Sequence, residues 1–501
     1  MKKRIYGLET EYGIALKRNG NWFCEDNDLR SYLGNIAPHF RENGSRVYLE
    51  GNFQPEYCTA ECLSLLDLIA QDKAGERIIK KLLSHSIREN EKILLFKNNV
   101  DYADPLGSTP FPYTANYVTF GCHENFLIEK RVSPESLKRV FLAFLTARQV
   151  ICGAGWVPSA GYQQRGIRYN ISQRARFMRR ETDGNTTSDR GIVCTARLNE
   201  PLSNHEEYQR FHLIVGDSNM SEFSTYLKMG TVGILLEMLE DGYPFKEIFM
   251  RDAITAIRLV SRDVTCKEAV IELEDGKFLS AINVLYHYLE QIEEYKNSQG
   301  LNPELLDIYE KFLDVVQRLE KRKIDKKTGF EENSHGLDEE LDWLIKKSML
   351  EETLIAFDCD WTNFKEDEND SGRKNINVFD DIRAKDLMYH ETSEEGLYYH
   401  PSQPDSKIFE LKSVGARSPR MVEEEKITKA ETVPPQNTRA KLRGDFIKLI
   451  KEKSIESKFG IDWESISNPY QSISLSDPFE TKNEILSTVA SAIRRGDYFS
   501  N

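Results

Sequence analysis

The chain has 501 residues, of which 40% are hydrophobic and 30% charged, and its net charge is −14. This composition is typical of a soluble globular protein, and the length suits two or three domains with at least one large core. The negative charge argues against non-specific nucleic-acid binding and against anchoring on anionic lipid. We therefore expect partners that are neither nucleic acid nor membrane.

Eight cysteines are scattered along the sequence without any C-x-x-C pair. At this length they indicate neither a zinc site nor a disulfide framework, so reduced thiols in a cytoplasmic protein are expected. The first eleven residues are charged and contain no apolar signal region. The most apolar segment, near residues 140–156, is interrupted by Arg148 and is too short to span a bilayer.

The first predicted strand covers residues 4–14, and its alternation places Glu9 and Glu11 on one face. The two carboxylates are then about 7 Å apart, because a strand rises about 3.4 Å per residue. Two such groups repel each other and are costly to bury unless a cation lies between them. The segment therefore suggests either a cation site or a solvated strand face.

Residues 46–62 supply a matching strand, in which Arg46, Tyr48 and Glu50 share one face before Pro55 is expected to end the ladder. If both strands belong to one sheet, several oxygen ligands could converge there: Glu9, Glu11, Tyr48, Glu50 and Glu56. Such a set suits Mg²⁺ rather than zinc. The alternative is a pair of amphipathic strands with a wet outer face.

The remaining periodicities predict helices separated by strands. Helical patterns cover residues 63–90, 133–151, 225–240, 281–350 and 438–453, and strand patterns cover residues 92–100, 117–128 and 211–222. The strand pattern at residues 117–128 places His123 and Asn125 on one face. A lone histidine such as His212 is usually a hydrogen-bonded core residue. The six arginines within residues 165–180 indicate either a solvated basic face or an anion groove.

Familiar nucleotide and hydrolase motifs are missing from the sequence. There is no G-x-x-x-x-G-K-[ST] loop, no H-E-x-x-H pair and no G-x-S-x-G elbow, and Pro158 occupies the last glycine position of the nearest G-x-G-x-x-G pattern. What remains is a set of carboxylate-rich strands with arginines. That combination is typical of a metal-bound nucleotide held without a glycine-rich loop.

Eleven short motifs follow one another in order along most of the chain. They occupy residues 7–13, 46–50, 55–57, 60–62, 72–76, 96–99, 121–125, 148–155, 172–174, 216–222 and 434–444. Together they resemble the Pup ligase and Pup deamidase family, with residues 353–430 the weakest stretch. The resemblance implies an α+β, glutamine-synthetase-like fold, in which a curved antiparallel sheet with flanking helices cradles ATP and Mg²⁺. It also implies a catalytic domain over residues 1–430, with a polar insertion at about 363–381, and a small C-terminal domain over residues 431–501.

The resemblance also implies roles for single residues. The magnesium positions correspond to Glu9, Tyr48 and Glu56, and the ATP positions to Arg46, Thr59 and Trp463. Glu50 occupies the position of the family's catalytic aspartate, so the carboxylate is kept on a side chain longer by one methylene. A regular strand would place Glu56 and Thr59 on opposite faces, so the chain is expected to bend after Pro55 if both serve the site.

The implied activity is an ATP-dependent ligation of a Pup-like protein tag to lysine-bearing target proteins. The γ-carboxylate of the tag's C-terminal glutamate would form an acyl phosphate, and a lysine amine would then displace the phosphate. A short segment at residues 15–45 and the spellings at residues 121–124 and 216–221 resemble the ligase more than the deamidase. The alternatives are a deamidase or depupylase, and a non-catalytic relative, which the glutamate at position 50 would favour.

Overall fold

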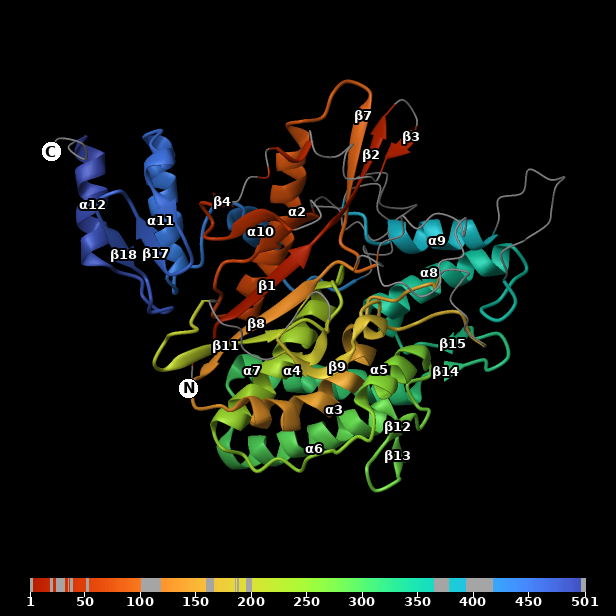
Figure 1. The fold of residues 1–501 in the computed structure, drawn as a ribbon. Helices are drawn as coiled ribbons and strands as arrows, with labels where there is room; N and C mark the ends of the chain where they lie inside the picture. The colour runs from red at the N-terminus through yellow and green to blue at the C-terminus, as the bar shows by residue number, and fades with distance from the viewer. Residues whose placement is uncertain are drawn as a thin grey trace.

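The computed structural model describes residues 3–18, 21–23, 32–34, 36, 39–50, 54–100, 119–158, 166–184, 186, 189–194, 201–364, 378–392 and 418–496. Within these residues, the main sheet is antiparallel and has the strand order β11-β8-β1-β6-β5-β4 (Figure 1). Its strands are β1 (Tyr6–Glu11), β4 (His39–Phe40), β5 (Arg46–Glu50), β6 (Gln54–Cys58), β8 (Cys122–Glu129) and β11 (Tyr208–Leu213). The α+β class expected from the sequence is confirmed.

One face of this sheet is apolar because its strands alternate. Tyr6 lies opposite Phe126 in the β1–β8 ladder, and both rings are buried in the large core together with Leu8. Helices α3 (Pro134–Cys152) and α4 (Glu222–Glu240) contribute to the same core, and Figure 1 shows them on one side of the sheet. The other face of the sheet is therefore left for polar side chains.

The N-terminal segment forms two strands rather than the single strand predicted over residues 4–14. The chain leaves the main sheet at Tyr12, whose ring is fully buried in a second core, and continues as β2 (Gly13–Arg18). This strand pairs with β3 (Asn21–Phe23) and β7 (Glu91–Phe96) in a separate sheet. The alternation of the sequence continues across the junction, so periodicity alone could not reveal the change of sheet.

The expectation that Pro55 ends the ladder is wrong. Gln54–Cys58 is strand β6, which pairs with β5 on one side and with β1 on the other, and Pro55 lies opposite Leu49. The proline has no backbone N–H, but its carbonyl accepts a hydrogen bond of 2.9 Å from the N–H of Tyr12. Because β1 ends at Glu11, the proline lies at the end of the β1–β6 ladder, where a missing donor is tolerated.

Two of the long helices begin at serine capping residues. Ser64 accepts hydrogen bonds from the N–H groups of Leu66 and Asp67, so α2 covers Leu65–Ser84 and is shorter than the predicted 63–90. Ser133 caps α3 as predicted. The predicted helical region at 281–350 is interrupted by a hairpin of β14 (Lys323–Ile324) and β15 (Glu331–Asn333). Its helices are α6 (Ala281–Gln299), α7 (Pro303–Lys321) and α8 (Asp342–Ala356).

Smaller elements complete this part of the chain. They are α5 (Ala253–Arg262), α9 (Val378–Met388), α10 (Glu424–Ala430), β9 (Arg180–Asp183), β10 (Gly191–Cys194), β12 (Ile271–Glu272) and β13 (Phe278–Leu279). Most of the predicted insertion at 363–381 lies outside the described residues, and its last residues already belong to helix α9. Phe364 and Phe379 stack at a centroid distance of 6.0 Å across the two ends of this stretch.

The described arginines of residues 165–180 do not form one basic surface. Arg174 is 1% exposed and donates to the carbonyl oxygens of Ile214 and Phe120, so it is a structural group of the core. The Arg168 guanidinium lies over the ring of Phe364, at 5.7 Å from its centroid. At these two positions, neither the solvated face nor the anion groove expected from the sequence is present, and Arg165 lies outside the described residues.

The C-terminal elements have a hydrophobic cluster of their own, formed around Phe446, Ile466 and Leu486. Helices α11 (Ala440–Glu452) and α12 (Glu484–Arg495) pack with β16 (Gly460–Ile461), β17 (Ser465–Ser467) and β18 (Ser472–Ser474), and they stand apart from the large core in Figure 1. A domain division at residues 430/431 stays a prediction. Among the helices described, none combines the length and the apolar character needed to cross a bilayer.

Candidate active site

The candidate site is the polar face of the main sheet. Glu9 lies opposite Cys58 on β6 and opposite His123 on β8, and Glu11 lies opposite Glu56. Because directly opposed residues of an antiparallel ladder point to the same face, these five side chains share one surface. The same-face carboxylates expected from the sequence therefore converge, and the two segments share one sheet, in which β6 lies between β1 and β5.

Strand β5 adds three more of the predicted residues to this polar face. Tyr48 lies opposite Glu56, Arg46 lies opposite Cys58, and Glu50 pairs with Gln54 at the end of the strand. Glu56 is 2% exposed and Tyr48 is half-buried, whereas Glu50 is exposed. The predicted magnesium residues thus lie together, and the predicted catalytic carboxylate lies at the solvent edge of the same surface.

Three neighbours hold the Glu9 carboxylate in place. Its Oε1 accepts hydrogen bonds from Asn125 Nδ2 at 3.1 Å and from Arg210 Nη1 at 3.0 Å, while His123 Nδ1 lies 3.1 Å from its Oε2. Burial raises the pKa of Glu9, but the hydrogen bond from His123 and the neighbouring charges of His212 and Arg210 outweigh it. The pKa falls well below its ordinary value, and Glu9 is ionised at neutral pH.

Glu56 has the opposite electrostatic environment. Burial, followed by the negative charges of Glu9 and Glu11, raises the pKa of its carboxyl well above the ordinary value, and a hydrogen bond with Tyr48 offsets only part of this. A cation among these oxygens would remove the repulsion and let Glu56 ionise. The donor set of two carboxylates and a phenol oxygen fits a hard divalent cation such as Mg²⁺.

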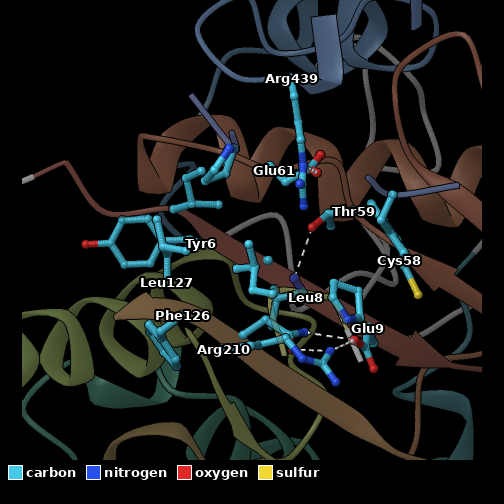
Figure 2. Close-up of a pocket in the computed structure, with 17 residues that line it drawn as sticks. Tyr6, Leu8, Glu9, Cys58, Thr59, Glu61, Phe126, Leu127, Arg210 and Arg439 are labelled. Atoms are coloured by element: carbon cyan, nitrogen blue, oxygen red, sulfur yellow. Dashed lines mark hydrogen bonds and ion pairs between the residues drawn. The ribbon is translucent and has the colours of Figure 1, made fainter. Parts of the chain in front are cut away.

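A cavity of about 140 Å³ opens beside Glu9, between the main sheet and the C-terminal elements (Figure 2). Its lining includes Gly7, Thr59, Arg210 and Trp463. Strand β6 ends at Cys58, and Thr59 follows it with its N–H donating to the carbonyl of Leu8 at 2.9 Å. The Thr59 hydroxyl accepts a hydrogen bond of 3.0 Å from the N–H of Leu8, and this contact fixes it at the wall of the cavity.

Aromatic contacts connect Trp463 with the predicted ATP residue Arg46. The rings of Phe40 and Trp463 meet edge to face at a centroid distance of 4.9 Å, and the Arg46 guanidinium lies 5.5 Å from the Phe40 centroid. Trp463 lines the cavity, whereas Arg46 and Phe40 are not among the residues that line it. Two of the three predicted ATP residues, Thr59 and Trp463, therefore lie at the cavity, and the tryptophan ring is an aromatic surface suited to a planar base.

Glu61 joins the sheet to the C-terminal elements. Its carboxylate accepts a hydrogen bond of 2.9 Å from Arg439 Nε and further bonds from Arg443. Arg443 also donates to the carbonyl of Trp463 at 3.1 Å and to that of Gly44 at 2.8 Å. Burial raises the Glu61 pKa, but the two arginines lower it to about 2. This contact, which we call the Glu61 latch, holds Trp463 at the cavity.

Sequence reasoning did not find two residues of the polar face. Arg210 was not singled out, and His212 was expected to be a core histidine, yet both project from β11 beside Glu9. Arg210 lies opposite Leu127 and His212 lies opposite Asn125, so they share a face with His123. The alternation within residues 208–213 carried this signal, but it has meaning only once β11 is known to pair with β8.

Two solved structures with a similar architecture are of Pup ligases. A crystal structure of the complex between the prokaryotic ubiquitin-like protein Pup and its ligase PafA matches 98% of this chain and 93% of that chain, with a TM-score of 0.79 and 26% identity. A structure of the Pup ligase PafA in complex with ADP matches 94% of this chain and 93% of that chain, with a TM-score of 0.72 and 26% identity.

Sequence comparison leads to the same family. The family model described as Pup-ligase protein matches residues 26–467. A Pup–protein ligase of Nakamurella multipartita is 33% identical over 512 residues, covering 98% of this chain and all of the relative. The corresponding ligase of Actinosynnema mirum is 33% identical and covers 97% of this chain and 98% of the relative. The chain belongs to the Pup ligase family, as the resemblance in the sequence had implied.

Proposed function

We propose that this protein is an ATP-dependent ligase that joins the C-terminal glutamate of a Pup-like tag to lysine side chains of target proteins. Family membership and the relatives named Pup–protein ligase support the reaction. The observation that carries the proposal is the convergence of Glu9 and Glu56 on one face, next to a cavity lined by Thr59 and Trp463. The reaction would take place in the cytoplasm, which agrees with described cysteines that form no disulfide with one another.

Within this proposal, Glu9, Tyr48 and Glu56 hold Mg²⁺. When bound, the ion offsets the negative charge of the polyphosphate and of the transferring phosphoryl group. The raised pKa of Glu56 supports this assignment, since the residue needs a positive partner to ionise. Arg210, fixed against Glu9 at 3.0 Å, supplies a further positive charge beside the phosphates.

Arg46, Thr59 and Trp463 would bind the ATP. The ring of Trp463 would stack against the base, and Thr59 would line the cavity between the base and the carboxylates. The cavity lies against Glu9, so a nucleotide whose base rests near Trp463 directs its phosphates toward the polar face. The structure with ADP reported for a PafA ligase, which shares this fold, supports the use of a nucleotide.

The proposed reaction has two steps. An oxygen of the tag's γ-carboxylate attacks the γ-phosphorus of ATP, and the bond to the leaving ADP oxygen breaks, which yields an acyl phosphate. The lysine nitrogen then attacks the acyl carbon and phosphate departs, leaving an isopeptide bond. Because a lysine amine has a pKa near 10.4, a base must take its proton, and we assign this role to Glu50.

Glu50 suits a base that meets a large protein substrate, since it is exposed at the end of β5. Glu50 also lies close enough to the buried carboxylates for its charge to contribute to the raised pKa of Glu56. The side chain is one methylene longer than the aspartate that the family resemblance implies, which moves the carboxylate by about 1.5 Å. A displacement of about 1 Å can cost about 10²-fold in rate.

A ligation assay tests the proposal. The enzyme is incubated with Mg-ATP, a Pup-like protein ending in glutamate and a lysine-bearing acceptor, and the products are read by intact mass together with ADP release. We expect a conjugate lighter by one water than the sum of its parts, with one ADP formed per conjugate. Release of the tag from a preformed conjugate, with no conjugate made from free tag and ATP, would establish the depupylase alternative instead.

A further inference from the structure

A thiol lies among the carboxylates proposed to hold magnesium. Cys58 is directly opposite Glu9 in the β1–β6 ladder and follows Glu56 by two residues on β6, so the three side chains share the polar face. The Cys58 Sγ lies 3.6 Å from Oε1 of Glu56. One potential ligand atom from each of the three residues lies within 4.8 Å of the others. The proposed reaction makes no use of this sulfur.

Cys58 is placed differently from two other cysteines near the sheet. Cys122 lies opposite Thr10, on the face turned away from Glu9, and both Cys122 and Cys62 belong to the large core. Cys58 is 5% exposed and lines the cavity beside Glu9 (Figure 2). The sulfur is therefore held firmly by its surroundings and is still within reach of small ions that enter the cavity.

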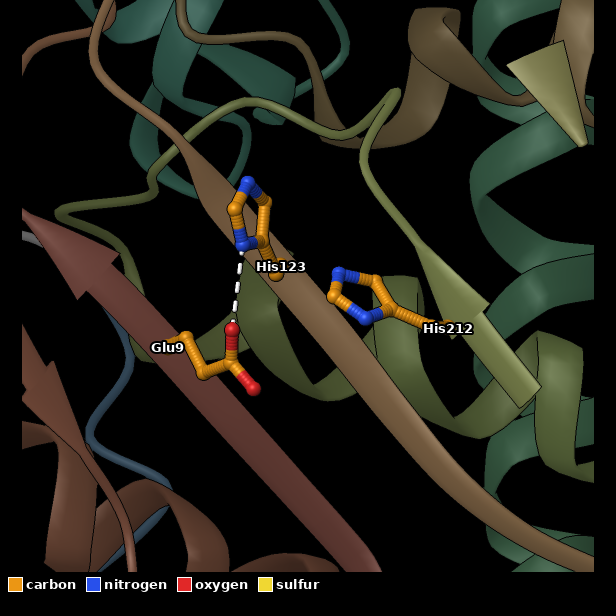
Figure 3. A group of neighbouring side chains, drawn as sticks. All are labelled: Glu9, His123 and His212. Carbon is orange, nitrogen blue, oxygen red and sulfur yellow. Dashed lines mark hydrogen bonds and ion pairs between the residues drawn. The ribbon is translucent and has the colours of Figure 1, made fainter. Parts of the chain in front are cut away.

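The positive partners of Glu9 lie on the other side of its strand. In the main sheet, β6 is on one side of β1 and β8 is on the other. His123 and Arg210 contact the Glu9 carboxylate from the side of β8 and β11, and Figure 3 shows the His123 ring beside it. Cys58 and Glu56 approach Glu9 from the β6 side. A cation bound on that side would therefore leave the existing partners of Glu9 in place.

We propose that Glu9, Glu56 and Cys58 bind a thiophilic divalent cation such as Zn²⁺, and that this ion inhibits ligation by displacing Mg²⁺. A thiolate is a soft ligand that Zn²⁺ accepts readily, whereas Mg²⁺ is a hard ion that takes oxygen. Zinc binding would replace the proton of the Cys58 thiol, which passes to solvent, and would form a zinc–sulfur bond. The inference rests on the proposed function, because Glu9 and Glu56 also belong to the proposed magnesium site.

The coordination preferences of the two ions explain the inhibition. Zn²⁺ prefers four ligands in a tetrahedron, so three protein ligands leave a single position for water or a phosphate oxygen. Mg²⁺ is octahedral and keeps several positions for water and phosphate oxygens beside its protein ligands. Tyr48, which lies opposite Glu56, is the proposed magnesium ligand that the sulfur would replace. The zinc-bound site would hold the polyphosphate through fewer contacts, and a displacement of about 1 Å can cost about 10²-fold in rate.

X-ray absorption at the zinc edge tests the proposal on the unaltered protein. The full chain, stripped of metal and free of nucleotide, is loaded with substoichiometric Zn²⁺, and the atoms around the ion are determined. We expect one sulfur at about 2.3 Å together with oxygen ligands at about 2.0–2.2 Å. A zinc shell without sulfur, or one with two or more sulfurs, would overturn the proposal. This result does not depend on whether a variant folds.

A variant then assigns the sulfur to its residue. Cys58→Ala should lose the sulfur from the zinc shell and, after loading with Co²⁺, the thiolate-to-cobalt charge-transfer band in the near ultraviolet. Cys58→Ser, which nearly keeps the size of the side chain, should lose both signals as well. The matched control is Cys359→Ala, because Cys359 is a partly exposed thiol far along the chain from the site. A sulfur ligand retained in either Cys58 variant, with normal thermal melting, would contradict the assignment.

Zinc inhibition of ligation measures the consequence of this binding. The wild type, Cys58→Ala and Cys359→Ala are assayed with Mg-ATP and increasing free Zn²⁺, each relative to its own rate without zinc. Cys58→Ala should raise the half-inhibitory Zn²⁺ concentration by at least about tenfold, because even the loss of a hydrogen-bond partner of a metal ligand costs about 10–100-fold in affinity. Equal zinc sensitivity of all three proteins would refute the inhibitory role of the site.

The two measurements separate this inference from the proposed function. A zinc shell with one sulfur in a protein that never ligates the tag would uphold the zinc site and refute the proposed function. Ligation with Mg²⁺ by a protein whose bound zinc has no sulfur ligand would refute the zinc site alone.

Discussion

Breaking the Glu61 latch should loosen the C-terminal elements and weaken ATP binding. In Glu61→Gln, the carboxylate is lost while Arg439 and Arg443 stay buried at 3% and 0% exposure. Removing one partner of a buried ion pair typically costs about 3–5 kcal/mol, because the remaining charge is left uncompensated. The Glu61 pKa gives a similar figure, since the difference between 4.5 and about 2 corresponds to about 3 kcal/mol.

The same pKa sets the pH range of the effect. A carboxylate whose pKa is depressed on folding contributes its full stabilisation above the unfolded value of 4.5, and this is lost as the pH falls through about 2. At pH 7, Glu61→Gln should therefore unfold at lower urea concentration and show a higher KM for ATP, since Arg443 also holds the carbonyl of Trp463. As the pH falls through about 2, the stability of the two proteins should converge.

The matched control is Glu431→Gln. Glu431 pairs with Arg77 at 3.5 Å, and both side chains are partly exposed at 26% and 35%, so the expected cost is at most about 1 kcal/mol. Urea unfolding at pH 7 and at pH 2, with initial-rate kinetics at varied ATP at pH 7, measures both effects. If Glu61→Gln unfolds like the control and its KM for ATP is unchanged, the reasoning about the latch is refuted.

Three further predictions concern the residues of the site. Glu9→Ala and Glu56→Ala should abolish nucleotide-dependent ligation while circular dichroism shows an intact fold; a variant that turns over like the wild type would move the metal site elsewhere. Trp463→Ala should raise the apparent KM for ATP, with the exposed Tyr470→Ala as control, and an unchanged KM would remove the tryptophan from the site. Glu50→Gln should lose about 10²–10⁴ in ligation rate if this carboxylate is the base, whereas Glu50→Asp should retain or improve the rate. Equal activity of the wild type and of both variants would exclude Glu50 as the base.

The alternation of single strands predicted part of the site correctly. It placed Glu9 with Glu11 and Arg46 with Tyr48, because side-chain direction in a strand depends only on local geometry. The convergence of Glu9 and Glu56 also followed once the two segments were assumed to share a sheet. Only the two same-strand pairs needed no knowledge of distant packing.

Features that depend on pairing between distant segments could not be predicted in the same way. Pro55 was expected to end the ladder. It is tolerated within β6 because it lies at the end of the β1–β6 ladder, where a missing N–H costs little. The chain passes into a second sheet at Tyr12, because this ring is buried among residues that are distant in the sequence. His212 and Arg210 join the site only through the β8–β11 ladder.

An oxygen-18 transfer experiment tests the central claim most directly. A Pup-like tag carrying ¹⁸O in the γ-carboxylate of its C-terminal glutamate is incubated with the enzyme, Mg-ATP and a lysine-bearing acceptor, and the released phosphate is analysed by mass spectrometry. Ligation through an acyl phosphate predicts one ¹⁸O atom in each phosphate released, together with one ADP per conjugate. Phosphate containing only ¹⁶O alongside a formed conjugate, or conjugate formed without ADP, would contradict the account.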